Sequence, residues 1–152
     1  MIIDLDAHQG NGHERDFMKD KDVFIIDFYN PDIFPNDEYA KDGIDVYCHI
    51  DERTNDEQYI DKMEELIPSA ISKFLPDFIV YNAGTDILEG DQLGGCRISG
   101  NGIVRRDEKV FEYAFGYKIP ILMVLSGGYM QENAPIIARS INNIFLQYRL
   151  ES

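Results

Sequence analysis

Residues 4 to 12 concentrate side chains that can do metal chemistry. After an apolar run at 1–3 the chain reads Asp4-Leu5-Asp6-Ala7-His8-Gln9-Gly10-Asn11-Gly12. Asp6 and His8 are two residues apart, and on a strand this spacing puts both side chains on one face. A carboxylate oxygen and an imidazole nitrogen together form a plausible half-site for zinc. The alternative is a polar strand-to-loop turn, with aspartates capping backbone N–H groups and the histidine at the surface.

Three further polar clusters each follow an apolar run. Asp27 follows the run at 23–26, a glycine-rich acidic loop over 82–95 follows the run at 78–81, and the segment 126–129 follows the run at 121–125. Open α/β sheets place their functional groups at the carboxyl ends of parallel strands. We therefore expect the four clusters to meet in space, although they lie far apart in the sequence.

The later clusters offer a third metal ligand and an oxyanion donor. Asp91 or Asp86 could complete a site of two carboxylates and one imidazole with an open position, as in catalytic zinc sites; the spacing alone does not choose between them. Tyr129 follows two glycines, so its O–H could stabilise a developing oxyanion in a cleft. Packing is the alternative role for this ring. His13 and His49 are interpreted as surface residues.

The elements that position these clusters follow from the apolar pattern, which is typical of a parallel α/β sheet with alternating strands and helices. It predicts strands at 1–3, 23–26, 44–50 (an edge strand), 78–81 and 121–125, and helices at 54–74, 102–115 and 132–148. Residues 13–20 read as a loop or short helix. Thr54 and Glu57 suggest a capping box, Pro68 should kink or divide its helix, and Gly116 suggests a helix end.

Composition limits the class of protein. The 152 residues predict one domain. A formal net charge of −14 argues against direct nucleic-acid binding and is compatible with a basic partner or with a solvated acidic surface. No apolar run reaches the roughly 18–20 residues of a membrane span, and no secretory leader is recognisable. Two cysteines, Cys48 and Cys96, predict reduced thiols in the nucleus or cytoplasm.

Three motifs, at 4–12, 82–94 and 126–129, together resemble the zinc-dependent histone deacetylases and are most similar to the class IV branch. The resemblance covers essentially all 152 residues in collinear order. It implies that residues 1–152 are the C-terminal part of a histone deacetylase catalytic domain, with an arginase-like α/β parallel sheet flanked by helices and truncated on its N-terminal side.

The resemblance also implies a set of site residues. The zinc ligands would be Asp6, His8 and Asp91, and the catalytic tyrosine that hydrogen-bonds the acyl carbonyl would be Tyr129. A potassium ion beside the zinc would use Asp4, Asp27 and the carbonyl of Phe28, and the substrate-binding residues would be Phe34, Ile98, Gly127 and Gly128. The implied substrates are acyl-lysine side chains of histone tails or other proteins, and corepressor-type proteins are the implied partners in chromatin regulation.

The chain departs from the family at the general base. In the family that role belongs to two adjacent histidines upstream of the first motif, and no such pair occurs here. Asn11 also stands where many members have an aspartate. We therefore expect the chain alone to deacylate poorly or not at all. It is either a hydrolase whose upstream half is missing from the sequence, or an inactive product that binds only zinc or partners. Met1 opens a strand expected to be central, and a sheet cut there would expose a long apolar edge, which favours the first alternative.

Overall fold

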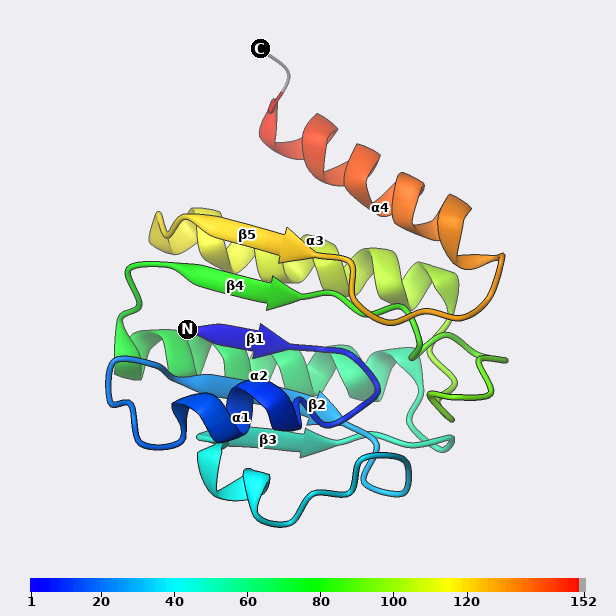
Figure 1. Cartoon of the computed structure of the whole chain (residues 1–152). Coiled ribbons are helices and arrows are strands. Elements are labelled where there is room, and N and C mark those ends of the chain that lie inside the picture. Colours follow the sequence, from blue (N-terminus) through cyan, green and yellow to red (C-terminus); the bar gives the residue numbers. More distant parts are fainter. Residues whose placement is uncertain (151–152) are drawn as a thin grey trace.

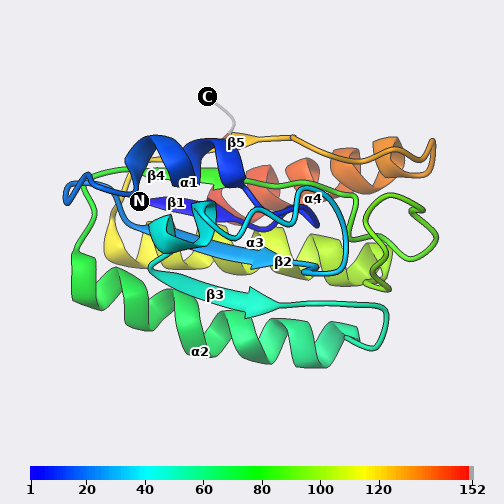
Figure 2. The same ribbon diagram turned by 60° about the horizontal axis from the view of Figure 1, so that its bottom comes forward.

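Five parallel strands form one sheet in the order β3-β2-β1-β4-β5 in the computed structural model, which describes residues 1–150 (Figure 1). The strands are β1 (Ile2–Asp4), β2 (Ile25–Tyr29), β3 (Val46–His49), β4 (Ile79–Asn82) and β5 (Ile121–Val124). The helices are α1 (Asn11–Phe17), α2 (Asp56–Phe74), α3 (Gly100–Tyr117) and α4 (Asn133–Tyr148), with a 3-10 turn, η1 (Ala40–Gly43), before β3. Helices α2 and α3 lie together on one face of the sheet, α1 covers the other, and α4 packs against α3 beyond β5 (Figure 2).

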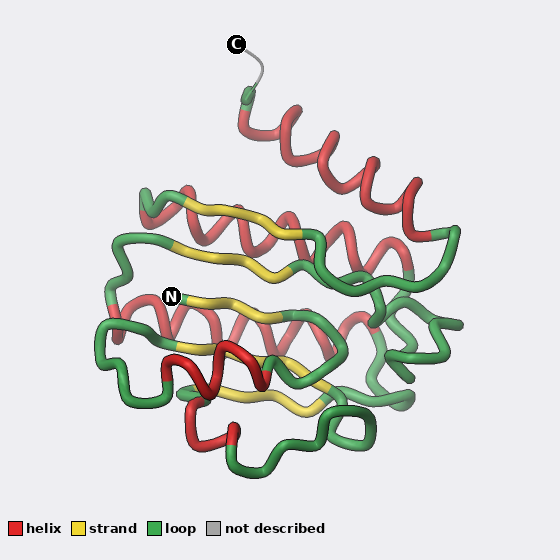
Figure 3. Tube along the Cα trace, viewed as in Figure 1, coloured by secondary structure: helices red, strands yellow, loops and turns green. Residues whose placement is uncertain are grey.

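The strand order places a switch in direction beside β1. The chain moves outward from β1 to β2 and β3, then returns across the sheet through α2 to β4 and β5. In open parallel sheets such a reversal opens a crevice at the carboxyl ends of the two strands that flank it. Here these strands are β1 and β4, and the loops that follow the strands gather at the same edge of the sheet (Figure 3).

The core explains why β1 is central. Ile3 is fully buried, and all five residues of β2 are buried as well, as expected for strands covered on both faces. The expectation of an exposed apolar edge at β1 is wrong, because β2 and β4 pair with β1 on its two sides. The edge strands are β3, as predicted, and β5, where Leu122 is 50% exposed.

The predicted details of α2 need two corrections. Its cap is Asn55, one residue later than predicted: the Asn55 side chain accepts from the Gln58 N–H and the Gln58 side chain accepts from the Asn55 N–H. Pro68 does not divide the helix, which is continuous from Asp56 to Phe74. Six apolar residues along one face of α2 are buried, and this burial offsets the single backbone hydrogen bond that proline removes.

Helix α3 also runs further than predicted. It continues past Gly116 to Tyr117, and Lys118 supplies the left-handed cap with φ +59°. The Lys118 N–H donates to the carbonyls of Ala114 and Phe115, so two otherwise unpaired carbonyls of the last turn are satisfied. Residues 13–20, predicted as loop or short helix, lie largely in α1.

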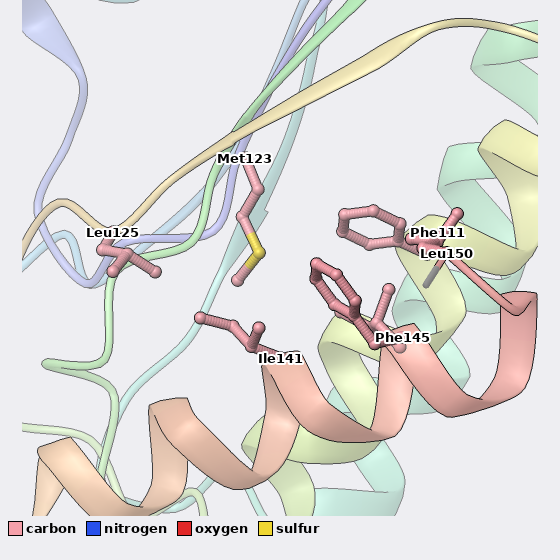
Figure 4. Close-up of a pocket in the computed structure, with 7 residues that line it drawn as sticks. Phe111, Met123, Leu125, Ile141, Phe145 and Leu150 are labelled. Atoms are coloured by element: carbon pink, nitrogen blue, oxygen red, sulfur yellow. The ribbon is translucent and has the colours of Figure 1, made fainter. Parts of the chain in front are cut away.

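An apolar hollow of about 260 Å³ separates α4 from β5 (Figure 4). Met123 and Leu125 face Ile141 and Phe145 across it, and its complete lining is Phe111, Met123, Leu125, Ile141, Ile144, Phe145 and Leu150. None of these side chains titrates, so the hollow contributes no acid, base or metal ligand. Among residues 1–150, no helix is both long and apolar enough to cross a membrane.

Candidate metal centre

Asp6, His8 and Asp86 meet beyond the carboxyl ends of β1 and β4. One donor atom from each lies within 4.8 Å of the others. His8 Nδ1 is 2.8 Å from Asp86 Oδ2 and 3.2 Å from Asp6 Oδ1. Tetrahedral zinc with bonds of about 2.0–2.1 Å holds its ligand atoms about 3.3 Å apart. Both carboxylates are buried while His8 is partly exposed. Two carboxylates and a neutral imidazole also balance a dication, so this donor set fits zinc with one open position.

Backbone N–H groups hold the two carboxylates. Asp6 Oδ1 accepts from the His8 N–H at 2.9 Å, Asp6 Oδ2 accepts from the Gly127 N–H at 2.9 Å, and Asp86 Oδ1 accepts from the Ala7 N–H at 2.8 Å. Burial acts to raise the pKa of Asp6, but these donors hold it below its ordinary value. Burial and the adjacent Asp6 raise the pKa of Asp86 to about 6. Asp6 is therefore charged well below neutral pH, and Asp86 loses its proton near pH 6.

Glycines allow the loops to approach this closely. A Cβ on Gly84 or on Gly127 would overlap the Asp6 carboxylate. Gly128 has φ +143°, and a Cβ there would overlap the Thr85 hydroxyl. Side chains at these positions would force the loops after β1, β4 and β5 apart. Gly127 and Gly128 thus both lie beside the candidate metal centre.

A cavity of about 660 Å³ opens over Asp6 and His8, two of the three donors. Its lining is Asp6, His8, Gln9, Asn11, Phe34, Pro35, Leu93, Ser126, Gly127, Gly128 and Tyr129. Phe34, which is 79% exposed, and Leu93, which is 54% exposed, are large apolar side chains of this lining. Phe34 therefore lines the cavity, its role in substrate binding stays a prediction, and Leu93 was not predicted. An apolar residue inside an otherwise polar, glycine-rich loop was the signal that could have identified Leu93.

Ile98, which the resemblance implies as a substrate-binding residue, is absent from the lining of this cavity, and its role in binding stays a prediction. Ile98 is fully buried and pairs with Leu88 in an isolated β-bridge. Its N–H donates to the carbonyl of Ile87 at 3.1 Å. The bridge turns Ile98 into the core, so it does not line the cavity.

Asp91, which the resemblance implies as the third zinc ligand, contacts backbone N–H groups, and its role as a ligand stays a prediction. Its Oδ2 accepts from the Tyr129 N–H at 2.9 Å, and its Oδ1 accepts from the N–H groups of Leu93 and Gly94 at 3.0 and 3.3 Å. Both oxygens therefore face backbone donors. Asp86, the alternative that the spacing left open, is the carboxylate of this loop that contacts His8.

Tyr129 lies at the cavity, beside His8. Its ring packs edge-on against His8 with centroids 6.2 Å apart, and the side chain is 60% exposed. Burial, Asp86 and Asp6 raise the pKa of the Tyr129 phenol above its ordinary value, so the phenol is a hydrogen-bond donor at neutral pH. The Tyr129 phenol therefore lies near the candidate ligands, and its role as an oxyanion donor stays a prediction.

A second acidic cluster lies deeper, between β1 and β2. Asp4 and Asp27 are register partners on the two strands and are fully buried. Burial raises the pKa of Asp4 to about 7, and burial with the charge of Asp4 raises that of Asp27 well above its ordinary value. Among the described residues, Asp27 Oδ1 and Glu14 Oε1 have no hydrogen-bond partner. Buried oxygens without donors fit a hard cation.

The residues around this second cluster differ partly from expectation. The Phe28 ring packs into the core against Tyr59, with centroids 5.8 Å apart, so only its carbonyl could bind a cation. His13 is not fully at the surface, since its side chain is 24% exposed and its Nε2 lies 3.6 Å from Asp4 Oδ2. His49 lies on the edge strand β3 and contacts the Tyr29 hydroxyl at 3.2 Å.

Residues 1–145 match the family described as the histone deacetylase domain. The chain belongs to the histone deacetylase family. It is 50% identical to Histone deacetylase 2 of Arabidopsis thaliana over 147 residues, which cover 97% of the chain and 38% of that protein. The crystal structure of the HDA15 HD domain superposes with a TM-score of 0.79 at 25% identity, covering 96% of this chain and 44% of that one.

Two further solved structures confirm the fold. They are the histone deacetylase Clr3, with a TM-score of 0.77 at 20% identity, and the acetylpolyamine aminohydrolase from Burkholderia pseudomallei, with a TM-score of 0.77 at 19% identity. The expected arginase-like parallel sheet of the deacetylases is therefore confirmed. The chain spans less than half the length of these relatives and structures.

Proposed function

We propose that the chain carries the metal centre of a zinc-dependent hydrolase that removes acyl groups from lysine side chains of histones or other proteins. The convergence of Asp6, His8 and Asp86, with Asp6 and His8 lining an open cavity, supports this proposal most directly. Membership in the deacetylase family supports the reaction class.

Each group at the cavity has a distinct role in this proposal. When bound by Asp6, His8 and Asp86, zinc supplies a Lewis acid for an acyl carbonyl. Tyr129 donates its phenolic proton in a hydrogen bond to the acyl oxygen, where negative charge develops. Phe34 is largely exposed at the cavity and covers the apolar stem of the lysine.

The finer assignments are part of the same proposal. The sequence of residues 4–12 supports membership in the class IV branch. The cluster of Asp4, Asp27 and the Phe28 carbonyl would bind potassium. A role in chromatin regulation, in the nucleus or cytoplasm and with corepressor-type partners, rests on the family alone. Because the sequence has no adjacent histidines, we expect little or no turnover by the 152-residue chain.

The test measures zinc content and substrate binding separately. The purified chain is loaded with zinc and desalted, and bound zinc is counted by mass spectrometry. Binding of a fluorescent peptide carrying one acetyl-lysine is then followed by anisotropy, with the unmodified lysine peptide as control. We expect one zinc per chain and binding of the acetylated peptide that requires zinc. Tyr129→Phe should weaken peptide binding and leave the zinc content unchanged.

Three other outcomes would contradict parts of the proposal. A chain without zinc would refute the metal centre. Retained zinc without preference for acetyl-lysine would instead support the inactive, zinc-binding alternative. Release of acetate by the chain, lost in Tyr129→Phe, would show that no adjacent histidines are needed.

A further inference from the structure

Arg106 is a buried cation that none of the preceding roles uses. It lies on α3, has no exposed surface and is the largest of the fully buried side chains. Its Nη1 donates to the carbonyls of Leu5 and Gly84 at 3.2 and 2.5 Å, and its Nη2 donates to the carbonyl of Ala83 at 3.1 Å. Its Nε donates to Asp107 Oδ1 at 2.8 Å. One guanidinium therefore joins three backbone carbonyls and one carboxylate.

The three carbonyls belong to the two loops that carry the metal ligands. Leu5 immediately precedes Asp6, and Gly84 lies two residues before Asp86. The named strands β1 and β4 end at residues 4 and 82, so the sheet ladder stops short of the ligands. Beyond that point Arg106 links the loop after β1 to the loop after β4, through Nη1.

Asp107 fixes the guanidinium in place. Its Oδ1 also accepts from the Tyr81 hydroxyl at 2.5 Å, and its Oδ2 accepts from the Ser140 hydroxyl at 2.5 Å. These contacts tie Arg106 to β4 and, through Ser140, to α4. The whole network is buried, and the charge of Arg106 is paired with that of Asp107. Both features limit the movement of the guanidinium.

The energetic balance argues for a role in positioning. A buried ion pair contributes less to stability than its contacts suggest, since desolvation of both charges is costly. An apolar side chain at 106 would pack but would leave the loop carbonyls without donors. A lysine would keep the charge, but a point charge on a flexible stem does not reproduce the planar fork of arginine.

We propose that Arg106 is a positioning residue for the metal centre: by joining the carbonyls of Leu5 and Gly84 it sets the separation between the loop that carries Asp6 and His8 and the loop that carries Asp86 and Asp91, and thereby the affinity for zinc. This inference rests on the proposed zinc site. Residues that orient metal ligands without touching the metal typically change metal affinity about tenfold to a hundredfold when mutated.

The test compares Arg106→Lys with Val110→Ala. Val110 lies one turn further along α3, is fully buried and takes no part in the Arg106 network, so its truncation is the matched control for lost stability. Zinc affinity of each full chain is measured by competition with a chromophoric chelator, and stability by urea unfolding without zinc. We expect Arg106→Lys to weaken zinc binding about tenfold or more, and Val110→Ala to leave it within about twofold at comparable loss of stability.

Amide hydrogen exchange of the zinc-free chain gives a second readout. The Ala7 N–H donates to Asp86 and the Gly127 N–H donates to Asp6. Both amides should exchange faster in Arg106→Lys than in Val110→Ala. Equal exchange and equal zinc affinity in the two variants would overturn the positioning role.

The outcomes separate this inference from the proposed function. If the wild-type chain binds no zinc, the metal centre itself fails and the inference falls with it. If wild type binds zinc and Arg106→Lys binds equally well, the inference alone fails. If Arg106→Lys does not fold, Ser140→Ala decides, since it removes one anchor of Asp107: weaker zinc binding supports the role and unchanged binding refutes it.

Discussion

Replacing Asp86 by asparagine should separate metal binding from folding, with effects of opposite sign. Asparagine keeps the shape of the side chain, and its Oδ1 can still accept from the Ala7 N–H. It removes the negative charge that faces His8 and lies next to Asp6. Zinc binding therefore loses a charged ligand, while the zinc-free chain loses a buried like-charge repulsion.

The expected loss of affinity can be estimated. Zinc binding worth about 10–16 kcal/mol over four ligands assigns about 3 kcal/mol to each, which is about a hundredfold in Kd. At a zinc concentration of about 100 times the wild-type Kd, zinc stabilises wild type by about 2.7 kcal/mol. At the same concentration the variant gains only about 0.4 kcal/mol.

The direction of the stability change in the zinc-free chain follows from the pKa of Asp86. Its folded-state value of about 6 lies above its ordinary value of 3.8, because of burial and the nearby Asp6. The folded state therefore binds this proton more tightly than the unfolded state, and stability falls as pH rises from about 4 to about 6. At pH 7 the ionised Asp86 is a net cost, so Asp86→Asn should unfold at the same or higher temperature without zinc.

Thermal unfolding with and without zinc at pH 7 measures both effects. Asp61→Asn, an exposed change on α2, is the matched control and should behave as wild type. An Asp86→Asn chain that binds zinc as tightly as wild type, or that is strongly destabilised without zinc, would refute the reasoning.

Three other predictions concern the cavity, the core and the second cluster. Gly127→Ala should lose zinc binding in the chelator competition, because its Cβ would overlap the carboxylates of Asp6 and Asp86; zinc affinity equal to wild type would show that the loops move freely. In urea unfolding, Ile98→Ala should lower the free energy of unfolding by about 2–5 kcal/mol. Leu93→Ala, at an exposed position, should change it by less than about 0.5 kcal/mol. Equal losses in the two variants would contradict the placement of Ile98 in the core. Potassium chloride should raise the unfolding temperature more than tetramethylammonium chloride at equal ionic strength, since only the small ion fits between buried oxygens; the same shift with both salts would argue against a potassium site.

The alternation of apolar runs and helical periods was enough to predict the fold class, and all five strands lie where the runs predicted them. The strand order was not predictable in the same way. Nothing local in residues 78–81 says that β4 returns to the far side of β1, yet this return creates the crevice and buries β1 on both sides. Pro68 shows the same limit locally, since burial of one face of α2 offsets the hydrogen bond that proline removes; the cap formed by Asn55 and Gln58 is instead a local pattern that the sequence contains.

The choice between Asp86 and Asp91 depended on contacts between distant loops. Both are aspartates in one glycine-rich segment, five positions apart. The Thr85 N–H donates to the Gly127 carbonyl at 2.7 Å, which ties the loop after β4 to the loop after β5 next to Asp86. Asp91 closes its own turn through Leu93 and Gly94 and also accepts from the Tyr129 N–H in the loop after β5. Motif spacing indicated a carboxylate in this loop, and the folded geometry places Asp86 beside His8.

Zinc-edge anomalous diffraction from crystals of the zinc-loaded chain tests the metal centre most directly. The account predicts one peak within about 2.0–2.2 Å of donor atoms of Asp6, His8 and Asp86, with Asp91 still hydrogen-bonded to the Tyr129 N–H. A peak coordinated by Asp91 in place of Asp86, or no peak beside His8, would contradict it.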